Sequence, residues 1–153
     1  MTSLITPPEV APVEETPVED VAVRPARTVV RPGILPAPGP KQWVAACSLH
    51  VLVPGRGVAV LLPGGGQAAL FLLPNGMIYA VDNIDPYSGA AVMSRGLTGD
   101  HGGEPTVASP LLKQVFSLRT GAALDDPDNP EVALPTYSVR VHHGVVRIGI
   151  PLP

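Results

Sequence analysis

The sequence has little cysteine and few aromatic residues: one Cys in 153 residues, and 4% Phe, Trp and Tyr together. The single thiol, Cys47, excludes an intramolecular disulfide, and no charged-then-apolar leader opens the chain, so we expect a cytoplasmic protein. The longest apolar runs, such as QAALFLL at 67–73, are far shorter than the roughly 20 residues that span a bilayer. The sequence therefore predicts a soluble protein without a membrane segment.

Basic residues are also scarce. Ten Lys and Arg stand against 13 Asp and Glu, which gives a formal net charge of −3. No basic stripe with interleaved aromatic residues is present, and such a stripe is what the phosphate backbone of a nucleic acid requires. We expect no nucleic-acid partner.

Turn-forming residues are abundant instead. Sixteen glycines and 20 prolines favour turns and short strands over long helices, which predicts an all-β domain. Residues 1–40 hold many of these prolines, several acidic residues and no aromatic residue, and little apolar surface there could offset the entropy of ordering. We therefore expect a disordered Pro-rich tail over 1–40, dispensable for folding, and one β domain over 41–153.

Short apolar segments separated by turns predict eight strands in antiparallel sheets. The clearest is the hairpin over 137–150, where Tyr137, Val139 and Val141 alternate with polar residues and a return strand follows His143 and Gly144. The segment 109–116 also fits a helical turn, and periodicity alone leaves that choice open. The eight strands are expected at 42–47, 57–62, 67–73, 77–82, 106–109, 114–118, 137–142 and 145–150.

No catalytic set is visible in the sequence. The four histidines, His50, His101, His142 and His143, lack ligand partners at metal-binding spacing and are expected to be turn residues. The acidic segment 125–131 lacks the central glycine of a calcium loop, and we expect a solvated loop there. No serine lies in a nucleophile motif.

Two loops resemble the cluster-binding loops of Rieske proteins, which read Cys-x-His-x-Gly and Cys-Pro-x-His-Gly-x-x-Phe and close with Leu-x-Thr-Gly. The corresponding segments are NIDPYSGA at 83–90 and ASPLLKQVFSLRTG at 108–121. A Rieske centre needs two thiolates and two imidazoles. The ligand positions here hold Asp85, Tyr87, Ser109 and Leu112, whereas the scaffold positions match at Pro86, Gly89, Pro110, Phe116, Leu118, Thr120 and Gly121.

Nearly everything after residue 40 is similar to the small-subunit family of assimilatory NAD(P)H nitrite reductases, the NirD group of Rieske-like domains without cluster ligands. The similar segments are 43–47, 79–96, 99–121, 124–127 and 134–141. This resemblance implies a Rieske-like antiparallel β-sandwich or barrel with a small two-loop subdomain. It also implies a large-subunit partner that carries FAD, an iron–sulfur cluster and sirohaem and reduces nitrite to ammonium with six electrons. The chain would be an accessory subunit with no cofactor of its own.

Two other functions stay open: a Rieske-type electron-transfer ferredoxin, and a β-domain adaptor unrelated to nitrite. In Rieske proteins the two loops form an exposed tip, which by analogy could remain a contact surface. Tyr87, Arg95, Leu111 and Lys113 are then the expected partner contacts, and Leu112 could extend the apolar patch. Alternatively, Tyr87 and Leu112 fill the space that the cluster left.

We predict that the purified chain is colourless and free of iron, because one thiol and four scattered imidazoles cannot complete the Rieske ligand set. Visible absorption and iron analysis after anaerobic preparation measure this directly. Stoichiometric iron with charge-transfer bands would contradict the prediction and favour the ferredoxin alternative.

Overall fold

The computed structural model describes residues 41–152, and the predicted tail over 1–40 lies outside these residues, as does Pro153. Within them the chain is built from strands, with two single turns of 3₁₀ helix, η1 (Leu49–Val51) and η2 (Met93–Arg95). The predicted all-β class is confirmed. The strands are β1 (Lys41–Ser48), β2 (Gly57–Leu61), β3 (Gln67–Leu72), β4 (Ile78–Asp82), β5 (Leu97–His101), β6 (Glu104–Ala108), β7 (Val115–Ser117), β8 (Thr136–His142) and β9 (Val145–Pro151).

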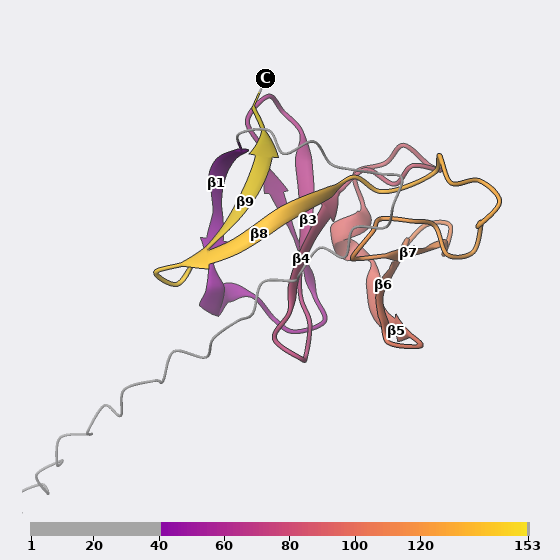
Figure 1. The fold of residues 1–153 in the computed structure, drawn as a ribbon, viewed down its shortest axis with the longest axis horizontal. Helices are drawn as coiled ribbons and strands as arrows, with labels where there is room; N and C mark the ends of the chain where they lie inside the picture. Colours follow the sequence, from indigo (N-terminus) through magenta and orange to yellow (C-terminus); the bar gives the residue numbers. More distant parts are fainter. Residues whose placement is uncertain (1–40, 153) are drawn as a thin grey trace, which may run out of the picture.

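The strands form two antiparallel sheets. The larger has six strands in the order β1-β9-β8-β4-β3-β2, and the smaller has three in the order β5-β6-β7. Figure 1 shows the larger sheet curled on itself and the smaller sheet to one side of it, among the long connections that precede β5 and follow β7. The small subdomain expected around the two loops is therefore present, with a sheet of its own.

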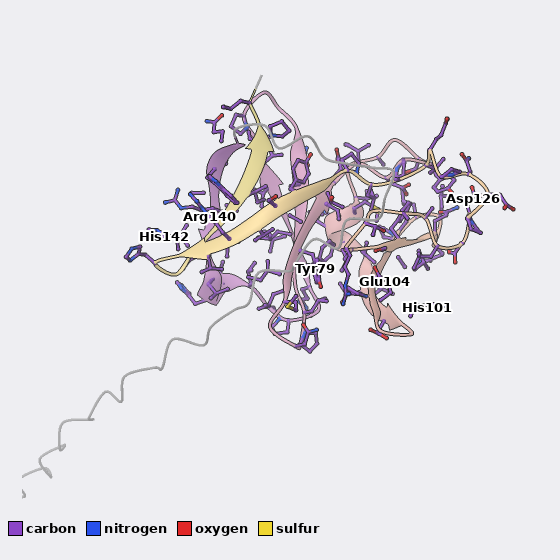
Figure 2. All side chains as sticks on the ribbon, viewed as in Figure 1. Tyr79, His101, Glu104, Asp126, Arg140 and His142 are labelled. Carbon is purple, nitrogen blue, oxygen red and sulfur yellow. The ribbon has the colours of Figure 1, made fainter. Side chains whose placement is uncertain are left out.

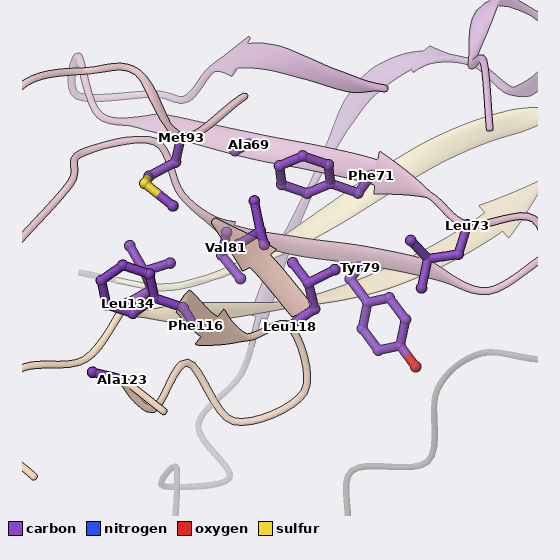
Figure 3. Packing of buried hydrophobic residues seen from close by; sticks show 11 residues of the cluster. Ala69, Phe71, Leu73, Tyr79, Val81, Met93, Phe116, Leu118, Ala123 and Leu134 are labelled. Carbon is purple, nitrogen blue, oxygen red and sulfur yellow. The ribbon is translucent and has the colours of Figure 1, made fainter. Parts of the chain in front are cut away.

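The central strands β3 and β4 are buried on both faces, which explains the continuous apolar run at 67–73. Ala68 and Leu70 face a cluster that fills the curled sheet, together with Val146 and Ile148 of β9. The alternate residues of β3 face a second cluster between the two sheets (Figure 3). Its buried members are Ala69, Phe71, Leu73, Tyr79, Val81, Met93, Val107, Phe116, Leu118, Ala123 and Leu134.

The predicted β8–β9 hairpin is confirmed. Its strands are joined by His143 and Gly144, both with positive φ (50° and 70°), as expected of a two-residue turn that suits the twist of a hairpin. The alternating apolar residues of both strands pack into the cluster inside the curled sheet.

Three local features depart from the predictions or were not among them. Strand β5 (LTGDH) was not expected, because its residues are mostly polar and exposed, and it pairs with β6 through the turn at Gly102 and Gly103. After the turn at 119–121 the chain makes two isolated bridges, Phe116 to Ala123 and Ala122 to Ala133, and forms no further strand before β8. The segment 109–114 is a single turn, closed by the hydrogen bond from the N–H of Lys113 to the carbonyl of Ser109, that leads directly into β7 and is not continued as a helix.

Gly57 allows the larger sheet and the segment around η2 to approach each other. A Cβ atom at this position would lie 2.3 Å from the carbonyl oxygen of Ser94 and 2.5 Å from Cε1 of Phe71. Both distances are shorter than any normal carbon contact, so one of these neighbours would have to move. Because Gly57 has no side chain, the segment around η2, which leads from β4 to β5, can lie directly against β2.

We predict that Gly57→Ala lowers the free energy of unfolding by about 1–3 kcal/mol, the usual cost of overpacking a close contact. Gly66→Ala is the matched control in the next turn, because a Cβ there meets nothing within 4 Å and φ is not positive. It should be neutral or slightly stabilising. Urea unfolding of both variants measures the difference, and equal stability would contradict the close approach.

Candidate functional site

The two Rieske-like loops extend from different sheets. Loop 1 (83–92) follows β4 of the larger sheet, and loop 2 (109–114) joins β6 to β7 of the smaller one. Loop 1 is anchored by the buried Asn83. Its Nδ2 donates to Oε1 of Gln67 at 2.9 Å, and its Oδ1 accepts the backbone N–H of Ser94 at 2.8 Å. The start of loop 1 is thereby fixed to β3 and η2.

Loop 1 then forms a compact turn around Asp85. The carboxylate Oδ1 accepts the backbone N–H groups of Tyr87 (2.9 Å) and Ser88 (3.4 Å). The Asp85 carbonyl accepts the N–H of Gly89 at 2.7 Å, and its N–H donates to the carbonyl of Ala90 at 2.8 Å. Gly89 has a φ of 71°, which reverses the chain.

Loop 2 repeats this turn around Ser109. Its Oγ accepts the N–H groups of Leu111 (3.3 Å) and Leu112 (3.4 Å), and its carbonyl accepts that of Lys113 at 3.1 Å. The N–H of Ser109 donates to the carbonyl of Gln114 at 2.9 Å. Lys113 takes the place of Gly89, with a φ of 70°, a conformation that is costly for a residue with a side chain.

A third copy of the turn follows β7. Ser117 Oγ accepts the N–H groups of Arg119 (3.1 Å) and Thr120 (3.0 Å), and its carbonyl accepts that of Gly121 at 2.8 Å. The N–H of Ser117 donates to Ala122 at 2.9 Å, and Gly121 has a φ of 76°. The side-chain oxygen at the first position organises each of the three turns.

Loops 1 and 2 are joined by one hydrogen bond. The Ser109 hydroxyl donates to Oδ2 of Asp85 at 2.6 Å, and both side chains are buried. These are the two positions where the Rieske pattern has cysteine. An oxygen pair that is already hydrogen-bonded, with Tyr87 and Leu112 in the imidazole positions, does not fit a [2Fe–2S] cluster. The two loops are held together by their own side chains.

The Asp85 carboxylate is held in its charged form. Burial raises its pKa, but the hydrogen bonds from the Ser109 hydroxyl, from Tyr87 and from Ser88 together lower it further, so the pKa lies below its usual value. A buried charge without an ion-pair partner is tolerated when several donors satisfy it. The N–H groups of loop 1 and the hydroxyl of Ser109 therefore stabilise the charge of Asp85 in place of water.

Tyr87 covers the side of this arrangement. Its ring packs 6.1 Å from that of Phe116, and its hydroxyl donates to Oδ2 of Asp126 at 2.9 Å. Burial, and then the hydrogen bond to Asp126, raise the pKa of the phenol. The neighbouring Asp125 accepts the N–H of Val115 at 2.9 Å. The acidic segment that sequence reasoning interpreted as a solvated loop therefore fastens Tyr87 and β7.

The other expected contact residues point outward. Leu111 is 53% exposed and Leu112 is 50% exposed, and Arg95 and Lys113 are exposed as well. Leu112 therefore does not fill the position of the cluster. Tyr87 is half-buried and packs against the cluster between the sheets. The structure thus places one of the two proposed filling residues inside and leaves the other on the surface.

His142 does not lie near the two loops. His142 lies at the end of the molecule remote from Asp126 (Figure 2). Over residues 41–152, no group of three or more His, Cys, Asp and Glu side chains is placed to hold a metal ion. None of the helices described there has the length and apolarity needed to cross a membrane.

The fold and the loop pair define a Rieske-like domain. Residues 42–149 match the family model of the Rieske-like [2Fe-2S] domain. The chain is also 41% identical over 108 residues to the nitrite reductase (NADH) small subunit of Salmonella typhimurium, a match that covers 70% of this chain and 96% of that one. The chain belongs to the family of nitrite reductase small subunits within the Rieske-like group.

Two further comparisons extend this finding. The crystal structure of a nitrite reductase small subunit from Mycobacterium tuberculosis superposes with a TM-score of 0.70 and 49% identity, over 74% of this chain and 99% of that one. The nitrite reductase [NAD(P)H] large subunit of Klebsiella oxytoca contains a segment 42% identical over 114 residues, which is 74% of this chain and 11% of that polypeptide. A related domain therefore also occurs within a large subunit.

The sequence predicts where the two loops lie but not the hydrogen bonds that fasten them. The hydrogen bond from Ser109 to Asp85 joins residues 24 apart, and that from Tyr87 to Asp126 joins residues 39 apart. The repeated turn did leave a pattern: Asp or Ser followed four residues later by Gly at 85–89 and at 117–121. Lys113 hides the same pattern in loop 2.

We predict that Asp85→Asn lowers the free energy of unfolding at neutral pH by about 1.5–3 kcal/mol, the range for a hydrogen bond to a charged group. Because the folded pKa of Asp85 lies below the unfolded value of about 3.9, its contribution is complete above that pH and is lost as the pH falls through the folded pKa.

Urea unfolding between neutral and strongly acidic pH measures this effect. The unaltered chain should lose stability on acidification, and Asp85→Asn should lose less. Asp128→Asn is the control, because Asp128 is exposed, and it should match the unaltered chain. An acid dependence unchanged in Asp85→Asn would show that Asp85 does not carry this charge.

Proposed function

We propose that this chain acts as the accessory small subunit of an assimilatory NAD(P)H-dependent nitrite reductase, which reduces nitrite to ammonium, and that it does so without a redox centre of its own. The family membership supports the oxidoreductase assignment. The hydrogen bond between Ser109 and Asp85 carries the second part, because it occupies the position at which a Rieske protein needs thiolates.

The proposed partner is the nitrite reductase large subunit. The related segment inside the Klebsiella oxytoca large subunit supports this, since two parts encoded in one polypeptide operate in one molecule. FAD, the iron–sulfur cluster and sirohaem would all reside in the large subunit, and electrons from NAD(P)H would reach nitrite there. We place the complex in the cytoplasm, in agreement with the single, unpaired Cys47.

We propose the exposed side of loops 1 and 2 as the docking surface. Leu111 and Leu112 present apolar side chains on a turn that four hydrogen bonds hold rigid, so little entropy is lost when a partner covers them. Lys113 stands at the rim, where its Nζ donates to the carbonyl of Pro110 at 3.0 Å. Arg95 could add a second rim charge, and Tyr87 would support the surface from below.

The two alternatives predict different behaviour. A Rieske-type ferredoxin would need ligands that this loop pair does not have. A β-domain adaptor unrelated to nitrite would share the fold but would not bind a sirohaem-type large subunit. Co-purification with that subunit, followed by nitrite-dependent NAD(P)H oxidation with and without this chain, separates the alternatives. Unchanged oxidation and no complex would contradict the proposed function.

We predict that Leu112→Asp weakens association with the large subunit by at least about 1 kcal/mol, because it places a charge in an apolar contact. Val51→Asp is the control: Val51 is 52% exposed in η1, whose Leu49 N–H donates to the carbonyl of Gly144 in the β8–β9 turn, at the end of the molecule remote from Asp126. It should bind normally. Both variants should keep the melting temperature of the unaltered chain. Equal binding by the two variants would place the docking surface elsewhere.

Lys113→Glu tests the rim in the same way. A rim charge should change the association rate and its dependence on salt, while an exposed position should leave stability nearly unchanged. Suppose instead that Lys113→Glu associates at the normal rate at low salt and Tyr87→Ala mainly lowers the melting temperature. The loop pair would then be a repaired cavity and not a docking surface.

A further inference from the structure

A second surface of the molecule carries uncompensated positive charge. It is the outer face of β1, β9 and β8, and we call it the arginine face, defined by Arg140, Arg147 and Trp43. Arg140 on β8 and Arg147 on β9 are directly opposite each other in the strand register. Like charges in that position destabilise a sheet, so an anion bound between the two guanidinium groups would offset the repulsion. Figure 2 shows Arg140 and His142 together on β8, remote from Asp126.

No anion for this pair lies in the part of the chain that the structure describes. Across residues 41–152, the single ion pair joins Arg119 to Glu104. The surroundings of His142 also indicate a positive potential, because His143 first, then burial, and then Arg147 and Arg140 lower the pKa of its imidazole.

Trp43 prepares Arg140 to bind a carboxylate. The guanidinium carbon of Arg140 lies 4.0 Å from the centroid of the Trp43 ring. Stacking of this kind uses the flat face of the guanidinium and leaves its N–H donors at the edge free for a bidentate anion. Because the stack already restricts the side chain, less entropy is lost when an acid binds.

The sequence places a matching anion close by. The first 23 residues contain five acidic residues and no Lys or Arg. These precede β1, which begins at Lys41 and pairs with β9, the strand that carries Arg147. Twenty residues separate Asp20 from Lys41, a length of chain that spans at most about 70 Å when fully extended, so the acidic residues can reach this face. The acidic residues are Glu9, Glu14, Glu15, Glu19 and Asp20.

We propose that the acidic segment 9–20 docks on the arginine face of its own chain, with its carboxylates bound to Arg140 and Arg147. The segment is tethered to the edge of the same sheet, so its effective concentration at this face is in the millimolar range and a weak contact suffices. Exposed ion pairs contribute little to stability, so removal of the segment should leave the melting temperature nearly unchanged. The contact therefore has to be detected at the face itself.

Trp43 is the only tryptophan of the chain and reports on this face directly. The experiment measures the quenching of its fluorescence by acrylamide, a neutral quencher, in the full chain at low salt. The test variant replaces the four glutamates with Gln and Asp20 with Asn. The control variant changes Arg24, Arg27 and Arg31 to Gln, which alters the same region with opposite charge.

Of the two variants in the first 40 residues, the proposal expects only the test variant to lose protection, with Trp43 quenched more strongly than in the unaltered chain. Arg147→Gln should lose protection in the same way without touching the Trp43 stack. At about 1 M salt, where the Debye length is about 3 Å, all of these chains should be quenched alike. Equal quenching of the test variant and the unaltered chain at low salt would overturn the proposal. Protection that increases with protein concentration would overturn it too, in favour of contact with a second copy.

Discussion

The hydrogen bond from Ser109 to Asp85 is the interaction on which the two-loop subdomain depends. It is a direct link between buried side chains of a loop of the larger sheet and a loop of the smaller one, and the bond from Tyr87 to Asp126 adds a second link at the side. In a Rieske protein four metal–ligand bonds make this connection. In this chain the negative charge of Asp85 strengthens the connection between the loops. Its buried carboxylate accepts three hydrogen bonds, and charge-assisted hydrogen bonds are about twice as strong as neutral ones. The loop geometry is thus kept by oxygen chemistry in place of iron and sulfur.

One turn, used three times, makes this replacement possible. In each copy a side-chain oxygen accepts the N–H groups two and three residues later, so the turn closes without help from outside the loop. A serine hydroxyl can accept these groups and still donate its own proton onward. Ser109 donates to Asp85, and Ser117 donates to Glu104. Two turns therefore present donors, and a carboxylate receives each of them.

The sequence predicts the parts of this fold that are determined by near neighbours. The β8–β9 hairpin is an example, because alternation and a two-residue turn are both local. Strand β5 was missed because its exposed polar residues show no alternation, and only pairing with β6 makes it a strand. The link between Asp85 and Ser109 is not visible in any short window, since each residue alone fits an ordinary turn. Lys113 is least expected, because a glycine position with a φ of 70° rarely holds a long side chain.

A loop pair whose residues do not fit a cluster offers a partner a different surface from that of a Rieske protein. A partner of a redox centre has to approach closely enough for electron transfer. Here the Asp85–Ser109 pair is buried, so a partner can contact only the outer surface of the two loops. That surface combines two exposed leucines with a lysine, an arrangement suited to a contact with an apolar centre and a charged rim. The arginine face lies on β8 and β9, remote from the acidic residue Asp126 that supports the loop pair. The two proposed docking sites are therefore on separate parts of the described chain, so the proposed binding of a large subunit at loops 1 and 2 would not compete with the proposed binding of segment 9–20.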